Sequence, residues 1–106
     1  MARKNIRETL PLSVLRALRR LGEDISVARR RRRLTAELLA ERALTSRSAV
    51  RRIEQGDPTV SMGLYAAVLH VLGLEGRLAS LVAPEEDELG MDLERESLPK
   101  RVRRPR

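Results

Sequence analysis

The stretch of sequence that decides the fold runs from Leu34 to Gly56 and reads LTAELLAERALTSRSAVRRIEQG. Its apolar residues recur at spacings of three and four, which predicts two short helices over residues 36–43 and 47–55. Thr35 and Ser46 precede these helices as expected N-caps, because a side-chain oxygen there can accept a hydrogen bond from the first turn. Gly56 is expected to end the second helix in the left-handed conformation that favours glycine.

Two short helices joined by a few residues have the layout of a helix-turn-helix, a motif whose second helix enters the major groove of DNA. A helix about 10–12 Å across fits this groove, which is about 12 Å wide. An arginine side chain there can bind the edge of a guanine through two parallel hydrogen bonds. The residues predicted to read bases all lie in the second helix: Arg47, Ser48, Arg51 and Arg52.

An arginine-rich segment precedes this motif. Residues 12–33 are predicted to form one long helix, or two helices with a joint at Gly22. The run from Arg29 to Arg33 covers more than one helical turn, so its members point in several directions. One interpretation is contact with DNA phosphates, for which Arg30 and Arg33 are the predicted residues. The other is a solubilising helix end that complements the helix dipole.

The remainder of the chain continues the helical pattern. Two further helices are predicted over residues 62–72 and 75–82. The pattern as a whole predicts an all-α domain of five short helices over residues 12–83. A flexible basic N-terminus (residues 1–11) is expected before this domain, and a polar, acidic-then-basic tail (residues 84–106) after it.

The composition excludes several classes of function. The 106 residues include no cysteine and one histidine, His70, which argues against disulfides, zinc fingers and histidine-centred triads. We also find no glycine-rich phosphate loop and no paired carboxylates, so the sequence predicts neither an enzyme nor a cofactor. No apolar run approaches the roughly 18 residues of a membrane span, and no secretory signal is evident. The expected location is the cytoplasm.

Charge is distributed unevenly along the chain. Residues 1–60 carry 15 basic and 7 acidic groups, which predicts attraction to DNA. Residues 85–96 carry seven acids and one arginine. They are interpreted as a helix start, as a surface for a basic partner, or as a segment that docks back on the arginine-rich helix. Residues 97–106 carry five basic groups, and either a DNA-binding arm or a protein-binding segment is consistent with them.

The spacing of the central motif resembles that of the Xre/Cro-type repressors of bacteria and phage, over about residues 24–82. The matching residues are Leu34-Thr35, Leu39-Ala40-Glu41-Arg42-Ala43, Ser46-Arg47-Ser48 and Ile53-Glu54-Gln55-Gly56. The resemblance implies a compact five-helix, lambda-repressor-like domain that binds a palindromic operator in double-stranded DNA as a homodimer. It also implies a bacterial protein that lies at the nucleoid when it is bound to DNA. By position, Arg47, Ser48 and Arg52 fall where family members read bases. Thr35 and Ser46 fall where the helix N-termini of family members touch phosphates, and the neighbouring Thr45 is also predicted to contact phosphate.

Two residues depart from the family pattern. The usual glycine of the turn is Leu44 here, which implies either a left-handed residue strained by about 1–2 kcal/mol or a different turn. The common glutamine after Thr35 is Ala36, which removes one expected contact to phosphate or base.

A narrower resemblance concerns the segments that frame the motif. The arginine-rich first helix, the Gly56-Asp57-Pro58 turn followed by Val60-Ser61-Met62-Gly63, and the tail Leu98-Pro99-Lys100-Arg101-Val102 are similar to HipB-like antitoxins. Such antitoxins bind a HipA-like serine/threonine kinase toxin and repress their own operon.

The last two predicted helices carry more aliphatic surface than one small domain can bury, which predicts a dimer interface. The residues assigned to this interface are Leu74, Leu78 and Leu81. The sequence thus predicts a dimeric repressor that is the antitoxin of a type II toxin–antitoxin system. The alternatives are an Xre-family repressor without a toxin, and a non-enzymatic adaptor that binds an acidic protein.

Overall fold

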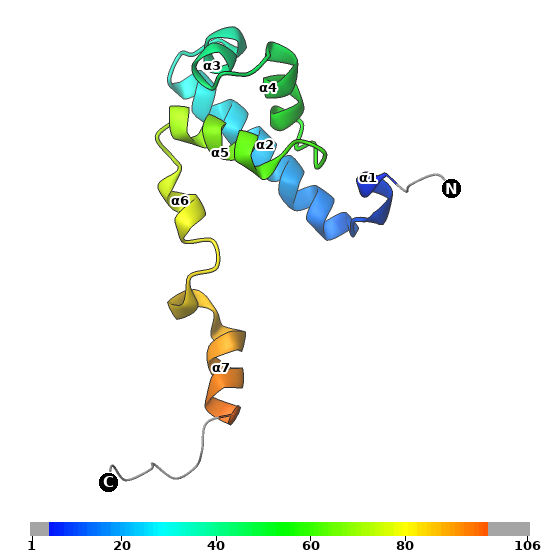
Figure 1. Cartoon of the computed structure of the whole chain (residues 1–106), viewed down its shortest axis with the longest axis vertical. Helices are drawn as coiled ribbons and strands as arrows, with labels where there is room; N and C mark the ends of the chain where they lie inside the picture. The colour runs from blue at the N-terminus through cyan, green and yellow to red at the C-terminus, as the bar shows by residue number, and fades with distance from the viewer. Residues whose placement is uncertain (1–4, 98–106) are drawn as a thin grey trace. The chain divides into compact units, whose positions relative to one another are not determined.

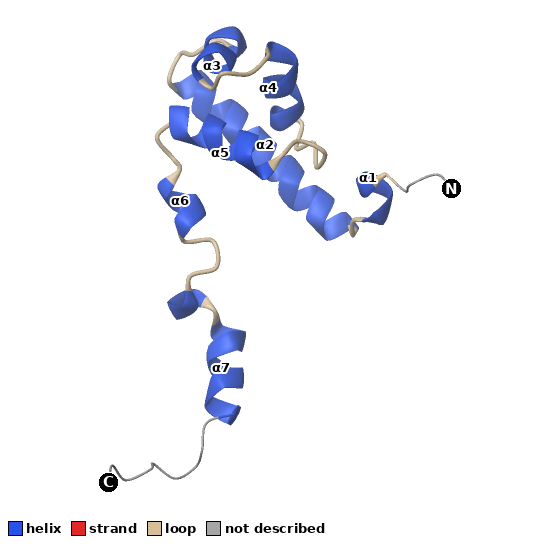
Figure 2. Cartoon of the chain, in the orientation of Figure 1, coloured by secondary structure: helices blue, strands red, loops and turns tan. Residues whose placement is uncertain are grey.

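The computed structural model describes residues 5–97, and every regular element in this range is a helix (Figures 1 and 2). The predicted all-α fold is confirmed. The chain divides into two compact units, which we describe separately: one ends at Gly76 and the other begins at Arg77. The basic end of the tail, residues 98–106, lies outside the described residues.

The first unit holds the predicted helix-turn-helix. Its helices are α1 (Ile6–Thr9), α2 (Leu12–Arg31), α3 (Ala36–Arg42), α4 (Arg47–Glu54) and α5 (Met62–Val71). The second unit holds most of α6 (Gly76–Ala79), the 3-10 turn η1 (Pro84–Glu86) and α7 (Glu88–Ser97). The five predicted helices correspond to α2–α6, and the structure adds α1, η1 and α7 to them.

The core of the first unit is aliphatic, as the near absence of aromatic residues requires. Helices α2 to α5 contribute the side chains that are fully buried: Ile25, Leu39, Val50, Ile53 and Val68. The single aromatic side chain, Tyr65, is also buried, and its hydroxyl donates a hydrogen bond of 2.9 Å to a backbone carbonyl. The polar atom of that ring is therefore satisfied inside the core.

Helix α2 is continuous through Gly22, so the alternative of two helices with a joint there is excluded. Gly22 is buried, and a Cβ atom at this position would lie 2.6 Å from the carbonyl oxygens of Ile53 and Glu54. Gly56 makes the reciprocal contact, because a Cβ atom there would meet the backbone of Leu18. The two glycines let α2 and the end of α4 approach backbone to backbone.

Four successive helices, α2 to α5, end in the same way. Each is followed by a residue with positive φ, and the next N–H bonds back to a carbonyl in the last turn, as in the Schellman motif. The residues with positive φ are Arg33, Leu44, Gly56 and Gly73. The left-handed conformation was predicted for Gly56, and Leu44 adopts the strained left-handed form that is one of its two alternatives. The conformations of Gly73 and Arg33 were not predicted.

The segment after α5 differs from the expected helix over residues 75–82. Helix α6 has four residues, and the hydroxyl of Ser80 donates to the carbonyl of Arg77, a local bond that competes with helix continuation. The first compact unit ends at Gly76. The domain bounds of residues 12–83 stay a prediction. Residues 6–9, within the segment expected to be flexible, form the helical turn α1.

Candidate nucleic-acid interface

Capping side chains fix the start of both helices of the motif. The hydroxyl of Thr35 accepts a 3.0 Å hydrogen bond from the N–H of Leu38, and that of Ser46 accepts a 3.1 Å bond from the N–H of Ala49. Both predicted N-caps are confirmed, and each stabilises its helix by about 1 kcal/mol. Between the helices, the turn places Leu44 at a φ of 57° with 93% of its surface exposed.

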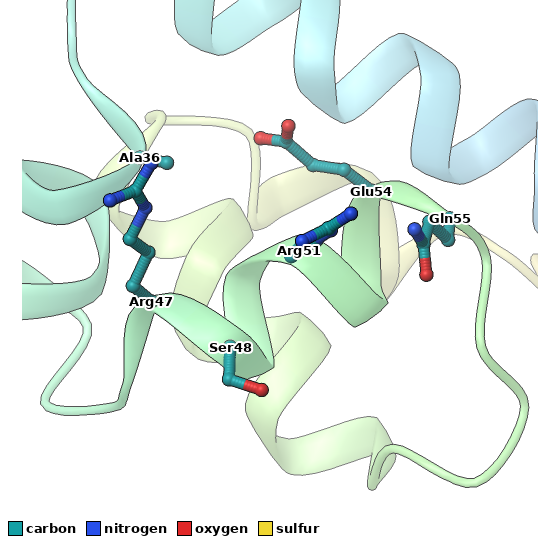
Figure 3. Close-up of a pocket in the computed structure, with 6 residues that line it drawn as sticks. All are labelled: Ala36, Arg47, Ser48, Arg51, Glu54 and Gln55. Carbon is teal, nitrogen blue, oxygen red and sulfur yellow. The ribbon is translucent and has the colours of Figure 1, made fainter.

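One face of α4 lines a shallow pocket of about 550 Å³, which Figure 3 shows in close-up. The lining residues are Ala36, Arg47, Ser48, Arg51, Glu54 and Gln55. Positions 51 and 55 follow positions 47 and 48 by three, four, seven or eight residues, which are about whole turns of helix, so all four lie on one side of α4. The structure thus brings three of the four predicted base-reading residues to one surface.

Gln55 belongs to this surface but was not among the predicted site residues. It directly follows the last residue of α4 and lies four positions after Arg51, so it continues the same face. The spacing of four from Arg51 could have identified Gln55 from the sequence. Because Gln55 is the last residue of the predicted helix, it was not assigned to the face. A glutamine can bind adenine through two hydrogen bonds, as an arginine can bind guanine.

Arg52 does not line this pocket. Its Nε donates to the Asp57 carboxylate at 3.0 Å, and its Nη2 donates to the Thr59 hydroxyl at 2.7 Å. The spacing of four placed Arg52 on the side of Ser48, but the sequence does not show that the loop after α4 folds back and holds the guanidinium. Its assignment as a base-reading residue stays a prediction.

Asp57 is the centre of a polar cluster at the end of α4. Its side chain is 5% exposed and accepts bonds from the hydroxyl and the N–H of Thr59 at 2.6 and 2.8 Å. Arg52 and Arg7 donate to its other oxygen at 3.0 and 2.7 Å. Burial raises the pKa of this carboxyl, but the bonds from Thr59, Arg52 and Arg7 outweigh it and hold the pKa well below its ordinary value.

A second ion pair joins the end of α2 to α4. The guanidinium of Arg29 binds the carboxylate of Glu54 through two hydrogen bonds, of 2.6 and 3.1 Å, and donates a third to the carbonyl of Leu34. Both charged side chains are only 15% exposed. The hydrogen bond from Arg29 to Glu54 raises the pKa of Arg29 more than burial lowers it. Arg29 is therefore a structural member of the arginine run.

The residues predicted to contact phosphates lie around the motif. Arg30, Arg33, Thr35 and Ser46 are exposed, and Thr45 is half-buried. Arg47 forms a 3.0 Å ion pair with Glu37, in which both side chains are about 70% exposed. Such an exposed pair contributes about 0–1 kcal/mol, so Arg47 can exchange it for a contact with DNA.

The residues assigned to a dimer interface fall in different units. Leu74 is half-buried in the first unit, whereas Leu78 is half-buried and Leu81 67% exposed in the second.

Among residues 5–97, no helix is long and apolar enough to cross a membrane. The same range contains no group of three or more histidine and acidic side chains placed to hold a metal ion.

The model of the helix-turn-helix domain family matches residues 13–81. The chain therefore belongs to this family, and the match supports a DNA-binding regulator of the Xre type. No curated protein matches the sequence, and no solved structure matches the fold significantly.

Proposed function

We propose that this protein is a sequence-specific transcriptional repressor that reads its operator with helix α4. The observation that carries the proposal is the single face of α4 on which Ser48, Arg51 and Gln55 lie together, with Arg47 at the helix start. The first turn of α4 is capped by Ser46, so its remaining free N–H groups and the helix dipole favour an approaching phosphate.

Each of these side chains has a distinct chemical role in the proposal. Arg51 binds guanine, Gln55 binds adenine, and Ser48 donates to or accepts from either base edge. Arg30 and Arg33, together with the starts of α3 and α4, contact phosphates and set the register on the duplex. Because Asp57 and Thr59 hold Arg52, we propose that its main role is to fix the loop after α4.

The proposed active form is a homodimer on a palindromic operator. Two copies of α4 would enter successive major grooves, whose centres lie about 34–36 Å apart. The dimer and the interface residues Leu74, Leu78 and Leu81 come from the sequence, and size-exclusion chromatography with light scattering tests them. A Leu78→Asp variant is expected to be monomeric.

The experiment that tests the proposed function compares DNA from upstream of the protein's own gene with scrambled DNA, by fluorescence anisotropy at low and physiological salt. We expect a preference of roughly a thousandfold or more that persists at physiological salt. Equal and steeply salt-dependent binding to the two DNAs would mean that the arginines contribute only non-specific attraction, and would favour the adaptor alternative.

Arg51→Ala separates base reading from charge attraction. We expect it to relax the preference at one position of each half-site, with a loss of about 1–3 kcal/mol on the preferred base. The matched control is Arg30→Ala, which removes the same charge and is expected to weaken binding uniformly over all sequences. A uniform loss in both variants would contradict the assignment of Arg51.

The resemblance to HipB-like proteins carries a finer proposal, in which this repressor is also the antitoxin of a HipA-like kinase. Co-purification of the full chain with the product of the adjacent gene tests it. Formation of a stable complex that inhibits kinase activity supports the antitoxin role. A neighbouring gene that does not encode a kinase favours an Xre-family repressor without a toxin.

A further inference from the structure

A second concave surface lies beside the one described above. It has a volume of about 310 Å³ and lies where α1 and the first half of α2 meet the loop after α4. Its lining residues are Arg7, Leu15, Arg19, Gln55, Gly56, Asp57 and Pro58. Gln55 lines both surfaces, so the second one continues the proposed base-reading face beyond the end of α4.

The contacts of Arg7 in this surface are duplicated by another residue. Its Nη2 lies 2.7 Å from Oδ2 of Asp57, and the Nε of Arg52 lies 3.0 Å from the same oxygen. Thr59 occupies the other carboxylate oxygen through two hydrogen bonds. If Arg7 leaves, the buried charge of Asp57 therefore keeps a guanidinium and the Thr59 bonds, so the usual penalty for an unpaired buried charge is avoided.

The guanidinium of Arg7 also remains accessible to an outside ligand. Its side chain is 54% exposed, whereas that of Asp57 is 5% exposed, so a ligand at this surface meets the cation first. Arg19 also lines this surface, is exposed, and forms no ion pair among the described residues. The two arginines thus present positive charge around one concavity, and the one carboxylate there is already neutralised.

We propose that Arg7 and Arg19 bind a backbone phosphate of the duplex, next to the bases that α4 reads. This inference rests on the proposed function and extends the DNA interface from the helix-turn-helix to α1 and the first half of α2. A duplex phosphate is the proposed occupant because this surface continues the proposed base-reading face through Gln55. When α4 lies in the major groove, the DNA backbone passes the end of this helix.

The test measures the salt dependence of binding for Arg7→Ala, Arg19→Ala and the double variant of the full chain. One phosphate contact contributes about one to the slope of log K against log salt, so the double variant is expected to lose about that amount on operator and scrambled DNA alike. Arg20→Ala is the matched control, because Arg20 is a neighbouring exposed arginine that pairs with Asp24 and does not line the surface.

Several outcomes are distinguishable. Slopes for Arg7→Ala and Arg19→Ala equal to those of the wild type and Arg20→Ala would overturn the inference. Arg19→Ala keeps the test valid if loss of Arg7 impairs folding, since Arg19 makes no contact with Asp57 among the ion pairs of residues 5–97. If the wild type shows no sequence preference but the variants show the predicted slope changes, the proposed base-reading function is wrong and the phosphate site is retained. A second measurement compares how well inorganic phosphate and duplex DNA protect Arg7 and Arg19 from an arginine-modifying reagent. Equal protection by both, at the same phosphate concentration, would assign the surface to a free anion instead.

Discussion

At the scale of single residues, Asp57 links the sequence to a pH-dependent stability. The low pKa of this carboxyl in the folded protein means that the unfolded chain takes up a proton at higher pH than the folded one. The stabilisation is complete above the ordinary aspartate pKa of about 3.9 and is lost as the pH falls below it toward the lower folded value.

We therefore expect Asp57→Asn to lower the free energy of unfolding at pH 7 by about 2–3 kcal/mol, because Arg7 and Arg52 lose their buried partner. The deficit relative to the wild type should shrink as the pH falls below about 4. Urea unfolding at several pH values measures this, with Asp24→Asn as the control, because Asp24 is exposed and pairs only with Arg20 among residues 5–97. A deficit that stays constant down to a pH of about 2 would contradict the role given to the charge.

Leu44 occupies the turn position where a glycine is usual, so the sequence predicts either backbone strain or a different turn. The structure shows the strained alternative. The backbone of Leu44 is left-handed with a φ of 57°, and its side chain is 93% exposed, so packing does not compensate for the strain. The alternative of a different turn was equally consistent with the sequence, because the pattern of apolar residues does not specify the backbone of a turn.

We expect Leu44→Gly to raise the free energy of unfolding by about 0.5–1 kcal/mol, since relief of strain exceeds the entropy that glycine adds to the unfolded chain. Urea denaturation measures the change. Gly73→Ala serves as the reverse control, because its φ of 76° is also left-handed and a Cβ atom there meets no neighbour within 4 Å. A lower stability for Leu44→Gly would mean that the exposed leucine makes a stabilising contact.

At the scale of elements, the caps and the apolar spacing predicted α3, α4 and α5 to within a residue or two. These signals are local, so a sequence contains them in full. The spacing does not decide whether α2 continues through Gly22, because that depends on the end of α4, about 30 residues later in the chain. The contacts of Arg52 escape prediction for the same reason, since its partners lie in a loop whose path the spacing does not specify.

The close contact of α2 with α4 predicts that Gly22→Ala is strongly destabilising. A methyl group there would lie 2.6 Å from two backbone carbonyl oxygens, which cannot move as a side chain can, so we expect a loss of about 2–3 kcal/mol. Gly63→Ala in α5 is the control, because a Cβ atom there would have its nearest neighbour 3.9 Å away and alanine favours a helix. Thermal unfolding compares the two, and a neutral Gly22→Ala would show that α2 can shift.

At the scale of the whole molecule, the basic first half of the chain predicts attraction to a negatively charged partner such as DNA. The structure assigns different tasks to the basic residues of the first unit: Arg29 and Arg52 hold loops and helices together, whereas Arg47 and Arg51 line the proposed reading face. Net charge cannot distinguish these tasks, because it counts a buried guanidinium and an exposed one alike. Contacts between distant residues decide which arginines remain available to DNA.

The proposed dimer makes a prediction about the operator rather than about any residue. In a dimer, the two copies of α4 are held at one spacing, so both enter the major groove only when the half-sites lie on the same side of the duplex. Insertion of about 5 base pairs between the half-sites rotates one of them by about half a turn, and we expect the affinity to fall to that of a single half-site. Fluorescence anisotropy measures the ratio of the affinities for the original operator and for the operator with the insertion, with a scrambled duplex of equal length as the control. A protein that binds each half-site independently would tolerate the insertion, and the palindrome would then reflect two separate monomers.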